Sequence, residues 1–153
     1  MKILMVCLGN ICRSPLAEGI MQDMIKKNNL EYTIESAGTS SFHVGEKPDP
    51  RSIAIAADNG IDISHQRSQL LTADHIVNYD LIFVMDKSNY RDAMELAKTE
   101  EQRNKIKLFL KYGESEVTEV PDPYYTKGFD YVFELINNAS KVICKKLITQ
   151  DLS

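Results

Sequence analysis

The segment 6–15, Val-Cys-Leu-Gly-Asn-Ile-Cys-Arg-Ser-Pro, constrains the fold of this chain more than any other. An apolar run of strand length, 2–6, leads into it, and helical spacing begins at Pro15. The segment therefore joins a strand end to a helix start, where backbone N–H groups lack acceptors and the helix dipole is positive. Because Gly9 permits a tight turn and Asn10 tolerates a left-handed backbone, we expect a loop that curls around one tetrahedral anion.

Cys7 and Arg13 provide this loop with reactive chemistry. Cys7 stands where the strand should end, and Arg13 can fold its guanidinium over the same anion and hold two oxygens. The helix start, the arginine and the amides all favour the thiolate form of Cys7, which makes it a nucleophile at neutral pH. Ser14 can donate a hydrogen bond to the Cys7 sulfur when a covalent intermediate breaks down. Together these residues predict displacement at a phosphate.

Short apolar runs alternate with helical patterns along the rest of the chain. This order predicts right-handed parallel crossovers and a doubly wound α/β sheet with helices on both faces, whose ligand sites lie beyond the carboxyl ends of the strands. A length of 153 residues with 43% hydrophobic content predicts a single domain, 1–153. The predicted strands are 2–6, 32–36, 81–85 and 106–110, the last of which could also continue a helix, and the predicted helices are 15–29, 50–60, 86–97 and 132–147.

Composition excludes several classes of protein. A net charge of −4 leaves no basic footprint for nucleic acid. The apolar start is too short for a signal peptide, and no run reaches transmembrane length. An odd number of cysteines without a disulfide framework predicts a reducing compartment, the cytoplasm. No metal site is expected, because the cysteines and histidines do not have finger spacing: Cys7, Cys12, Cys144, His43, His65 and His75.

The second chemical element is the segment 121–125, Pro-Asp-Pro-Tyr-Tyr. A thiolate that attacks an aryl phosphate needs an acid to protonate the departing phenolate, and Asp122 is the candidate. The flanking prolines restrict its backbone and make a stiff mount. Tyr124 and Tyr125 follow directly and can form a wall against a substrate ring. Taken alone, the segment is better explained as a rigid loop that enters the last helix, and the rest of the pattern favours the acid.

A Cys-x5-Arg-Ser pattern near the N-terminus is typical of cysteine-dependent phosphatases, and the chain resembles the low-molecular-weight protein tyrosine phosphatase family. Segments 35–40 (Glu-Ser-Ala-Gly-Thr-Ser), 84–89 (Val-Met-Asp-Lys-Ser-Asn) and 121–125 match family landmarks in family order. The resemblance implies the flavodoxin-like strand order 2-1-3-4 and hydrolysis of phosphotyrosine through a cysteinyl-phosphate at Cys7, without metal or cofactor. Asp122 would be the general acid and then the general base, and Arg13 would stabilise the developing charge.

The resemblance also implies roles for residues around the loop. Ser36 and His65 match positions that hold Asn10 and the loop through hydrogen bonds. Asp86 either orders the Arg13 side of the loop or caps the following helix, and both interpretations stay open. The residues expected to contact phosphate or substrate are Leu8, Gly9, Asn10, Ile11, Cys12, Ser14, Phe42, Tyr124 and Tyr125.

Two side chains, Cys12 and Phe42, have a structural alternative to a role in the site. Cys12 is either a small buried residue at a helix start or, as the resemblance implies, the partner that captures an oxidised Cys7 in a disulfide. Phe42 matches an aromatic of the family's substrate crevice, and simple packing is the alternative. Cys144 is expected to pack within the last helix.

Three other functions must be weighed against a tyrosine phosphatase: an arginine phosphatase, an arsenate reductase and a phosphoprotein-binding module. Related arginine phosphatases carry threonine in place of Ile11, so the isoleucine favours phosphotyrosine. Arsenate reductases need two further cysteines, and Cys144 is alone and distant. A phosphoprotein-binding module has no need to keep Cys7, Arg13 and Asp122 together. The sequence thus predicts a monomeric phosphatase with phosphotyrosine proteins as substrates and phosphate or other oxyanions as inhibitors, and with no nucleic-acid or membrane partner.

Overall fold

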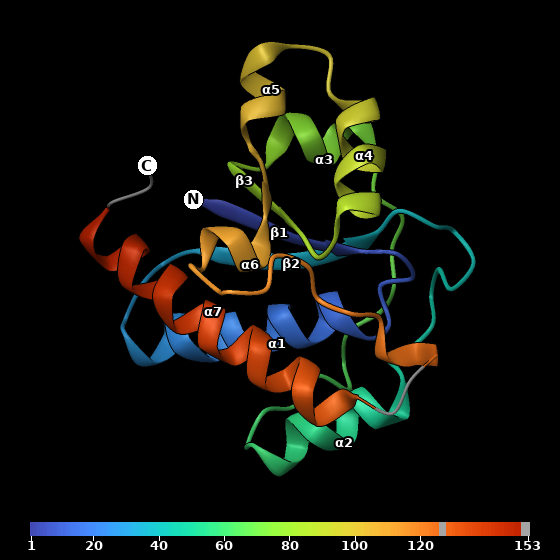
Figure 1. The fold of residues 1–153 in the computed structure, drawn as a ribbon, viewed down its shortest axis with the longest axis vertical. Helices are drawn as coiled ribbons and strands as arrows, with labels where there is room; N and C mark the ends of the chain where they lie inside the picture. The colour runs from blue at the N-terminus through green and yellow to red at the C-terminus, as the bar shows by residue number, and fades with distance from the viewer. Residues whose placement is uncertain (126–127, 151–153) are drawn as a thin grey trace.

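A four-stranded sheet in the order β2-β1-β3-β4 forms the centre of the molecule (Figure 1). All three neighbouring strand pairs are parallel, with Ile3 beside Ile34 on one side and Leu81 on the other. The predicted α/β class and the strand order 2-1-3-4 are confirmed. In the computed structural model, which describes residues 1–125 and 128–150, the strands are β1 (Lys2–Cys7), β2 (Thr33–Gly38), β3 (Leu81–Val84) and β4 (Ile106–Leu108).

Helices cover both faces of the sheet. In Figure 1, α1, α2 and α7 lie on one side, and α3 and α4 lie on the other. The 3-10 turn η1 follows the predicted acid, Asp122. The helical elements are α1 (Arg13–Lys27), α2 (Pro50–Asp58), α3 (Ala73–Asn78), α4 (Lys87–Leu96), α5 (Glu100–Asn104), α6 (Phe109–Tyr112), η1 (Pro123–Tyr125) and α7 (Phe129–Thr149).

Strand β1 is buried on both of its faces. Ile3 and Met5 pack against the cluster formed with α1 and α7, while Leu4 and Val6 pack against α3 and α4. All four side chains are fully buried. A central parallel strand must be apolar on both faces, which is why this run shows no polar alternation. Burial of each such side chain contributes about 1.5–3 kcal/mol, so this strand anchors the loop that follows it.

Local chemistry explains where some helices begin. The Asp49 side chain accepts a hydrogen bond from the Arg51 N–H at 2.9 Å, and Pro50 occupies the first turn of α2, as predicted. The fourth strand stops at Leu108, short of the predicted end at residue 110, because the chain turns there into α6. The short helix α3 was not predicted, since among its side chains only Ile76 is buried and no apolar period reveals it.

The carboxyl ends of the strands converge on one edge of the sheet. Cys7 ends β1, and Asp86 begins the turn into α4 two residues after β3 ends at Val84. The segment before η1 returns past the same edge, where the Val120 N–H donates to the Met85 carbonyl at 2.8 Å. Three distant parts of the sequence therefore meet beside the anion-binding loop. Within residues 1–125 and 128–150, no helix has the length and apolar character needed to cross a membrane.

Candidate active site

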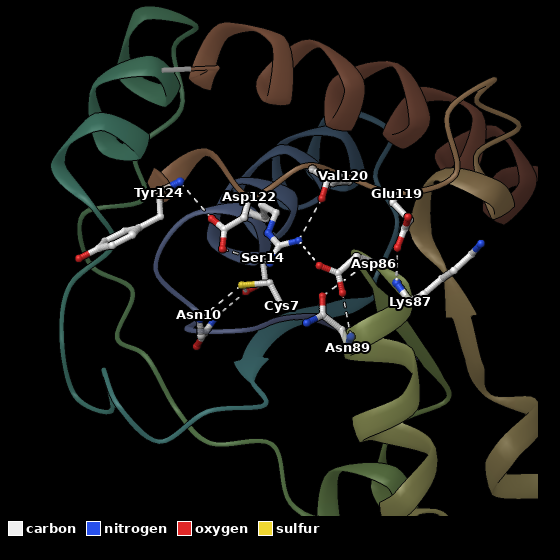
Figure 2. A network of polar contacts seen from close by, with 11 residues as sticks. Cys7, Asn10, Ser14, Asp86, Lys87, Asn89, Glu119, Val120, Asp122 and Tyr124 are labelled. Carbon is white, nitrogen blue, oxygen red and sulfur yellow. Dashed lines mark hydrogen bonds and ion pairs between the residues drawn. The ribbon is translucent and has the colours of Figure 1, made fainter. Parts of the chain in front are cut away.

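The loop after β1 folds back onto the Cys7 sulfur (Figure 2). Asn10 has a left-handed backbone, with φ of 57°, as the sequence predicts. This turn brings its backbone N–H to the Cys7 Sγ, at 3.3 Å. The Ser14 Oγ lies 3.0 Å from the same sulfur. A donor from the loop and a hydroxyl from α1 thus approach the thiol from two directions.

The side chain of Asn10 determines which way these hydrogen bonds run. Its Oδ1 accepts the backbone N–H of Gln69 at 3.0 Å, so its Nδ2 must face the two serines. That nitrogen donates to the Ser14 Oγ at 2.8 Å and to the Ser36 Oγ at 2.9 Å. Because the Ser14 oxygen accepts from Asn10, its own proton is available for the sulfur of Cys7.

A buried carboxylate completes this chain of hydrogen bonds. The Ser36 hydroxyl donates to the Glu18 Oε1 at 2.6 Å, and the Glu18 side chain also accepts from Gln22. Burial raises the pKa of Glu18, an effect that the hydrogen bond from Ser36 only partly opposes. Glu18 was not singled out from the sequence, because a glutamate on a helix is usually solvated.

The structure corrects the role expected for His65. His65 is exposed and forms no hydrogen bond with Asn10, all of whose partners lie within the described residues. The segment just after it provides the support instead: the Gln69 N–H binds Asn10, and the Ser68 hydroxyl donates to the Gly9 carbonyl at 3.0 Å. In this irregular segment Gln66 and Ser68 turn inward while His65 turns outward.

Arg13 is held inside the protein with only 2% of its side chain exposed. Its Nη1 donates to the Asp86 Oδ2 at 2.6 Å and to the Val120 carbonyl at 3.0 Å, and its Nη2 lies 3.6 Å from the Asp122 Oδ2. Burial lowers the pKa of the guanidinium, but the Cys7 sulfur, then Asp86 and Asp122, outweigh it and raise the pKa. Arg13 is therefore a fixed cation beside the thiol.

Asp86 has both of the roles that the sequence left as alternatives. Its Oδ1 accepts the Asn89 N–H at 2.8 Å and caps α4, while the Asn89 side chain accepts the Asp86 N–H at 3.2 Å. Its Oδ2 binds Arg13. One carboxylate thus orients the arginine and begins a helix, as the dashed contacts in Figure 2 show.

Asp122 faces the loop from the opposite wall of the cavity. Its Oδ1 accepts the Tyr124 N–H at 3.0 Å, a local turn that leads into η1 and fixes the carboxylate. The other oxygen of this carboxylate, Oδ2, lies 3.6 Å from the Arg13 Nη2. The carboxylate and the Cys7 sulfur line the same cavity.

A cavity of about 400 Å³ lies between these groups. Phe42 stands at its mouth with 82% of its surface exposed, so Phe42 is not a packing residue. Its ring meets the His43 ring edge-on at 4.9 Å, and His43 lies 6.2 Å from the Tyr124 ring. The Tyr125 side chain lies outside the described part of the chain. The cavity is lined by Cys7, Leu8, Gly9, Ile11, Cys12, Arg13, Ser40, Phe42, His43, Asp122 and Tyr124.

Two cavity residues, Ser40 and His43, were not identified from the sequence. The loop that carries His43 packs closely against the anion-binding loop, since a Cβ added at Gly9 would lie 3.0 Å from the His43 Cδ2. The His43 Nδ1 is 2.8 Å from the Glu46 Oε2, which fixes the ring over the loop. Contacts of this kind join segments far apart in sequence and cannot be read from either segment alone.

The cysteines differ in their surroundings. Cys12 is buried at the N-cap of α1, and burial, followed by the charge of Asp49, raises the pKa of Cys12 to about 12. Cys144 is buried within α7, where burial also raises its pKa. All three cysteines are free. Within the described residues, no group of three or more histidine, cysteine, aspartate or glutamate side chains is arranged to hold a metal ion.

Comparisons with known proteins agree with this geometry. The family model described as low molecular weight phosphotyrosine protein phosphatase matches residues 2–152. The low molecular weight phosphotyrosine protein phosphatase of Schizosaccharomyces pombe is 43% identical over 143 residues, which cover 89% of this chain and 90% of that protein.

Solved structures share the fold over nearly the whole chain. The protein tyrosine phosphatase of Entamoeba histolytica, with Hepes in its active site, has a TM-score of 0.93 and 36% identity and covers 99% of both chains. The Drosophila arginine phosphatase DARP has a TM-score of 0.90 and 30% identity, over 96% of this chain and 98% of its own. The Wzb tyrosine phosphatase of Escherichia coli K30, in complex with sulphate, has a TM-score of 0.84 and 33% identity, over 95% and 97%. The chain therefore belongs to the low molecular weight phosphotyrosine protein phosphatase family and is a phosphoric monoester hydrolase.

Proposed function

We propose that the chain hydrolyses phosphotyrosine in proteins by two successive displacements at phosphorus, with Cys7 as the nucleophile. One observation carries this proposal: the Cys7 sulfur, the Arg13 guanidinium and the Asp122 carboxylate line a single cavity. These groups come from opposite ends of the sequence, so their meeting is not a by-product of chain proximity. A nucleophile, a cation and an acid are the groups that phosphate transfer without a metal requires.

Binding of the phosphate uses the loop and Arg13. Backbone N–H groups at the start of α1 lack helical acceptors and bind anionic oxygens. Asp86 and Val120 both engage Nη1 of Arg13, which leaves Nε and Nη2 to hold two phosphate oxygens side by side. The arginine is already oriented, so little rotamer freedom is lost when the phosphate binds.

In the first displacement the Cys7 thiolate attacks phosphorus, the S–P bond forms and the P–O bond to the aryl group breaks. The Asp122 carboxyl gives its proton to the departing phenolate oxygen. The substrate ring would lie at the cavity mouth between Phe42 and Tyr124, which supply aromatic surface there. Ile11 forms part of the cavity wall.

In the second displacement a water molecule attacks the cysteinyl-phosphate. Asp122, now a carboxylate, takes a proton from the water, the new P–O bond forms and the S–P bond breaks. Cys7 leaves as a thiolate, which the Ser14 hydroxyl and the Asn10 N–H stabilise at 3.0 and 3.3 Å. Asn10 keeps the Ser14 hydroxyl oriented as a donor.

The test is hydrolysis of a phosphotyrosine peptide in the presence of chelator. Cys7→Ser should abolish turnover, because a serine alkoxide is far less available at neutral pH. Cys144→Ser is the matched control, since Cys144 lies in α7 and should leave turnover intact. Turnover by Cys7→Ser at the wild-type rate would refute the covalent mechanism. Absence of turnover in the wild type, with peptide binding retained, would support a binding module instead.

The role of Asp122 needs its own experiment. Asp122→Ala should lose about 10²–10⁴-fold in kcat on aryl phosphates with poor leaving groups and much less on those with good ones, because only poor leaving groups need protonation. Equal losses along the series would remove Asp122 from the acid role. A phosphoarginine peptide is run alongside, and a preference for it would keep the mechanism and change the substrate.

The proposal extends to the inhibitor, the oligomeric state and the cellular compartment of the enzyme. Inorganic phosphate should compete with substrate, because its oxygens match the loop and Arg13. We propose a monomer that functions as one domain in the cytoplasm. The three free cysteines support a reducing compartment.

A further inference from the structure

A second cleft, of about 450 Å³, lies at the β4 edge of the sheet. Tyr90 of α4 packs with the core on one face of the sheet, and Tyr112 of α6 packs with the core on the other face. Both tyrosines line this one cleft, together with Ile106 and Leu108 of β4. The cleft therefore wraps around the edge of the sheet rather than lying on either face.

The backbone of β4 offers hydrogen-bonding groups to this cleft. The Ile82 N–H of β3 donates to the Lys105 carbonyl at 2.9 Å, and Ile82 is paired with Ile106. In a parallel ladder, successive residues point their N–H and C=O groups to opposite sides. The Ile106 carbonyl and the Leu108 N–H thus point away from β3, along an edge that pairs with no other strand of residues 1–125 and 128–150.

The charged residues that line the cleft are all lysines. Lys107, Lys111 and Lys146 line it, whereas no acidic residue does, although the whole chain carries a net charge of −4. Lys146 is partly engaged, by the Tyr112 carbonyl at 2.8 Å and by Glu114 at 3.4 Å. Lys107 and Lys111 have no ion pair or hydrogen bond from their ammonium groups to any described residue. Two cations are thus free to bind an acidic ligand.

The side chains of β4 separate lysine from apolar residues on the two faces of the sheet. Because side chains alternate along a strand, Lys107 points to the opposite face from Ile106 and Leu108. Ile106 packs on the face of α4, so Lys107 shares the face of Lys146 in α7. A strand placed beside β4 would meet cations on one face and apolar or aromatic surface on the other.

We propose that this cleft binds an extended acidic segment of a partner protein, which pairs with β4 as a fifth strand and places its carboxylates among the three lysines. The segment would alternate acidic residues with β-branched ones, to match the two faces. Addition of a strand to an open edge supplies backbone hydrogen bonds for affinity, and the alternating side chains supply selectivity. This site is independent of the reaction at Cys7.

The test is binding of a short acetylated and amidated peptide in which glutamate and valine alternate, measured by fluorescence anisotropy with the full-length enzyme. Lys107→Ala and Lys111→Ala should each weaken binding about fivefold at low salt, and this difference from wild type should shrink at higher salt, because salt screens the attraction between lysine and carboxylate. Lys145→Ala is the matched control, because Lys145 is an exposed lysine of α7 outside the cleft and should leave binding unchanged. Hydrolysis of a small aryl phosphate should be the same in all three variants.

Strand pairing is tested separately from charge. Binding should protect the Leu108 amide from hydrogen exchange, and a peptide with proline at alternate positions should bind at least tenfold more weakly, because proline has no N–H to donate. Equal binding of the proline peptide would overturn the proposed pairing. Displacement of the peptide by an equal concentration of inorganic phosphate would reassign the cleft to a small anion. Equal affinity for a lysine-valine peptide, or self-association of the enzyme through this edge, would also overturn the proposal.

Discussion

Substitution of Asp86 separates the two roles of one carboxylate. Asparagine is as good an N-cap as aspartate, so Asp86→Asn keeps the contact to the Asn89 N–H and removes the charge that faces Arg13. A hydrogen bond to a charged group contributes about 1.5–3 kcal/mol. Loss of a fully buried pair would cost more, but 22% of the Asp86 side chain is exposed. We therefore expect the free energy of unfolding to fall by about 2 kcal/mol, or ~4–8 °C in Tm.

The comparison with Asp86→Ala divides this loss into its parts. Alanine also removes the cap, which should cost about 1 kcal/mol more. Urea denaturation measures the free energy of unfolding, and kcat/KM on an aryl phosphate should fall about tenfold in both variants because Arg13 loses its anchor. Thr99→Ala is the control, since it removes a cap hydrogen bond to the Gln102 N–H in α5 and should leave kcat/KM unchanged. An Asp86→Asn enzyme with wild-type stability and kcat/KM would refute the reasoning.

Two further predictions concern Glu18 and Gly38. Burial raises the pKa of Glu18, so its contribution to stability is present below its unfolded-state pKa and is lost as the pH rises through the folded-state value. The stability of Glu18→Gln relative to wild type should therefore rise from pH 4 to pH 7, as urea denaturation at the two pH values would measure. A difference in unfolding free energy that is the same at both pH values would contradict this expectation. Gly38→Ala should lower both stability and kcat, because the new Cβ would lie 2.7 Å from the Leu8 carbonyl of the loop. Gly113→Ala, whose Cβ would lie 2.5 Å from the Ala139 Cβ, should lower stability alone, and equal kcat losses would contradict this distinction.

The elements that sequence analysis predicted well are those whose pattern is local. The run 2–6 is apolar because β1 is buried on both faces, and Asp49 with Pro50 begins a helix through chemistry confined to one turn. The helix α3 has no such signal, because a capping box formed by Thr72 and His75 starts it and little apolar surface follows. Similarly, α6 occupies a segment whose apolar run fits a strand as well as a helical turn.

In the candidate site, too, residues within short motifs could be predicted and contacts between distant segments could not. Short motifs predict the loop residues and Asp122. The structure brings Asp122 and most of the loop to one cavity, whereas the predicted contact residues Asn10 and Ser14 are buried behind it and hold the loop. Gln69 and Val120 contribute through backbone atoms, which leave no mark on residue type. His65 forms no hydrogen bond with Asn10, although its charge acts on Glu18 of the same network, because position in a motif does not specify which side chains of an irregular segment are buried.

The position of Val120 against Arg13 also has a consequence for the order in which the protein is made. The anion loop is synthesised before the oxygen atoms that orient its arginine, which arrive with residues 86 and 120. The most extensive packing of α1 on another helix is against α7, the last helix. Such non-local contacts slow folding, because long loops must close before any contact is gained. During synthesis the reactive thiol therefore emerges well before the residues that complete the phosphate site.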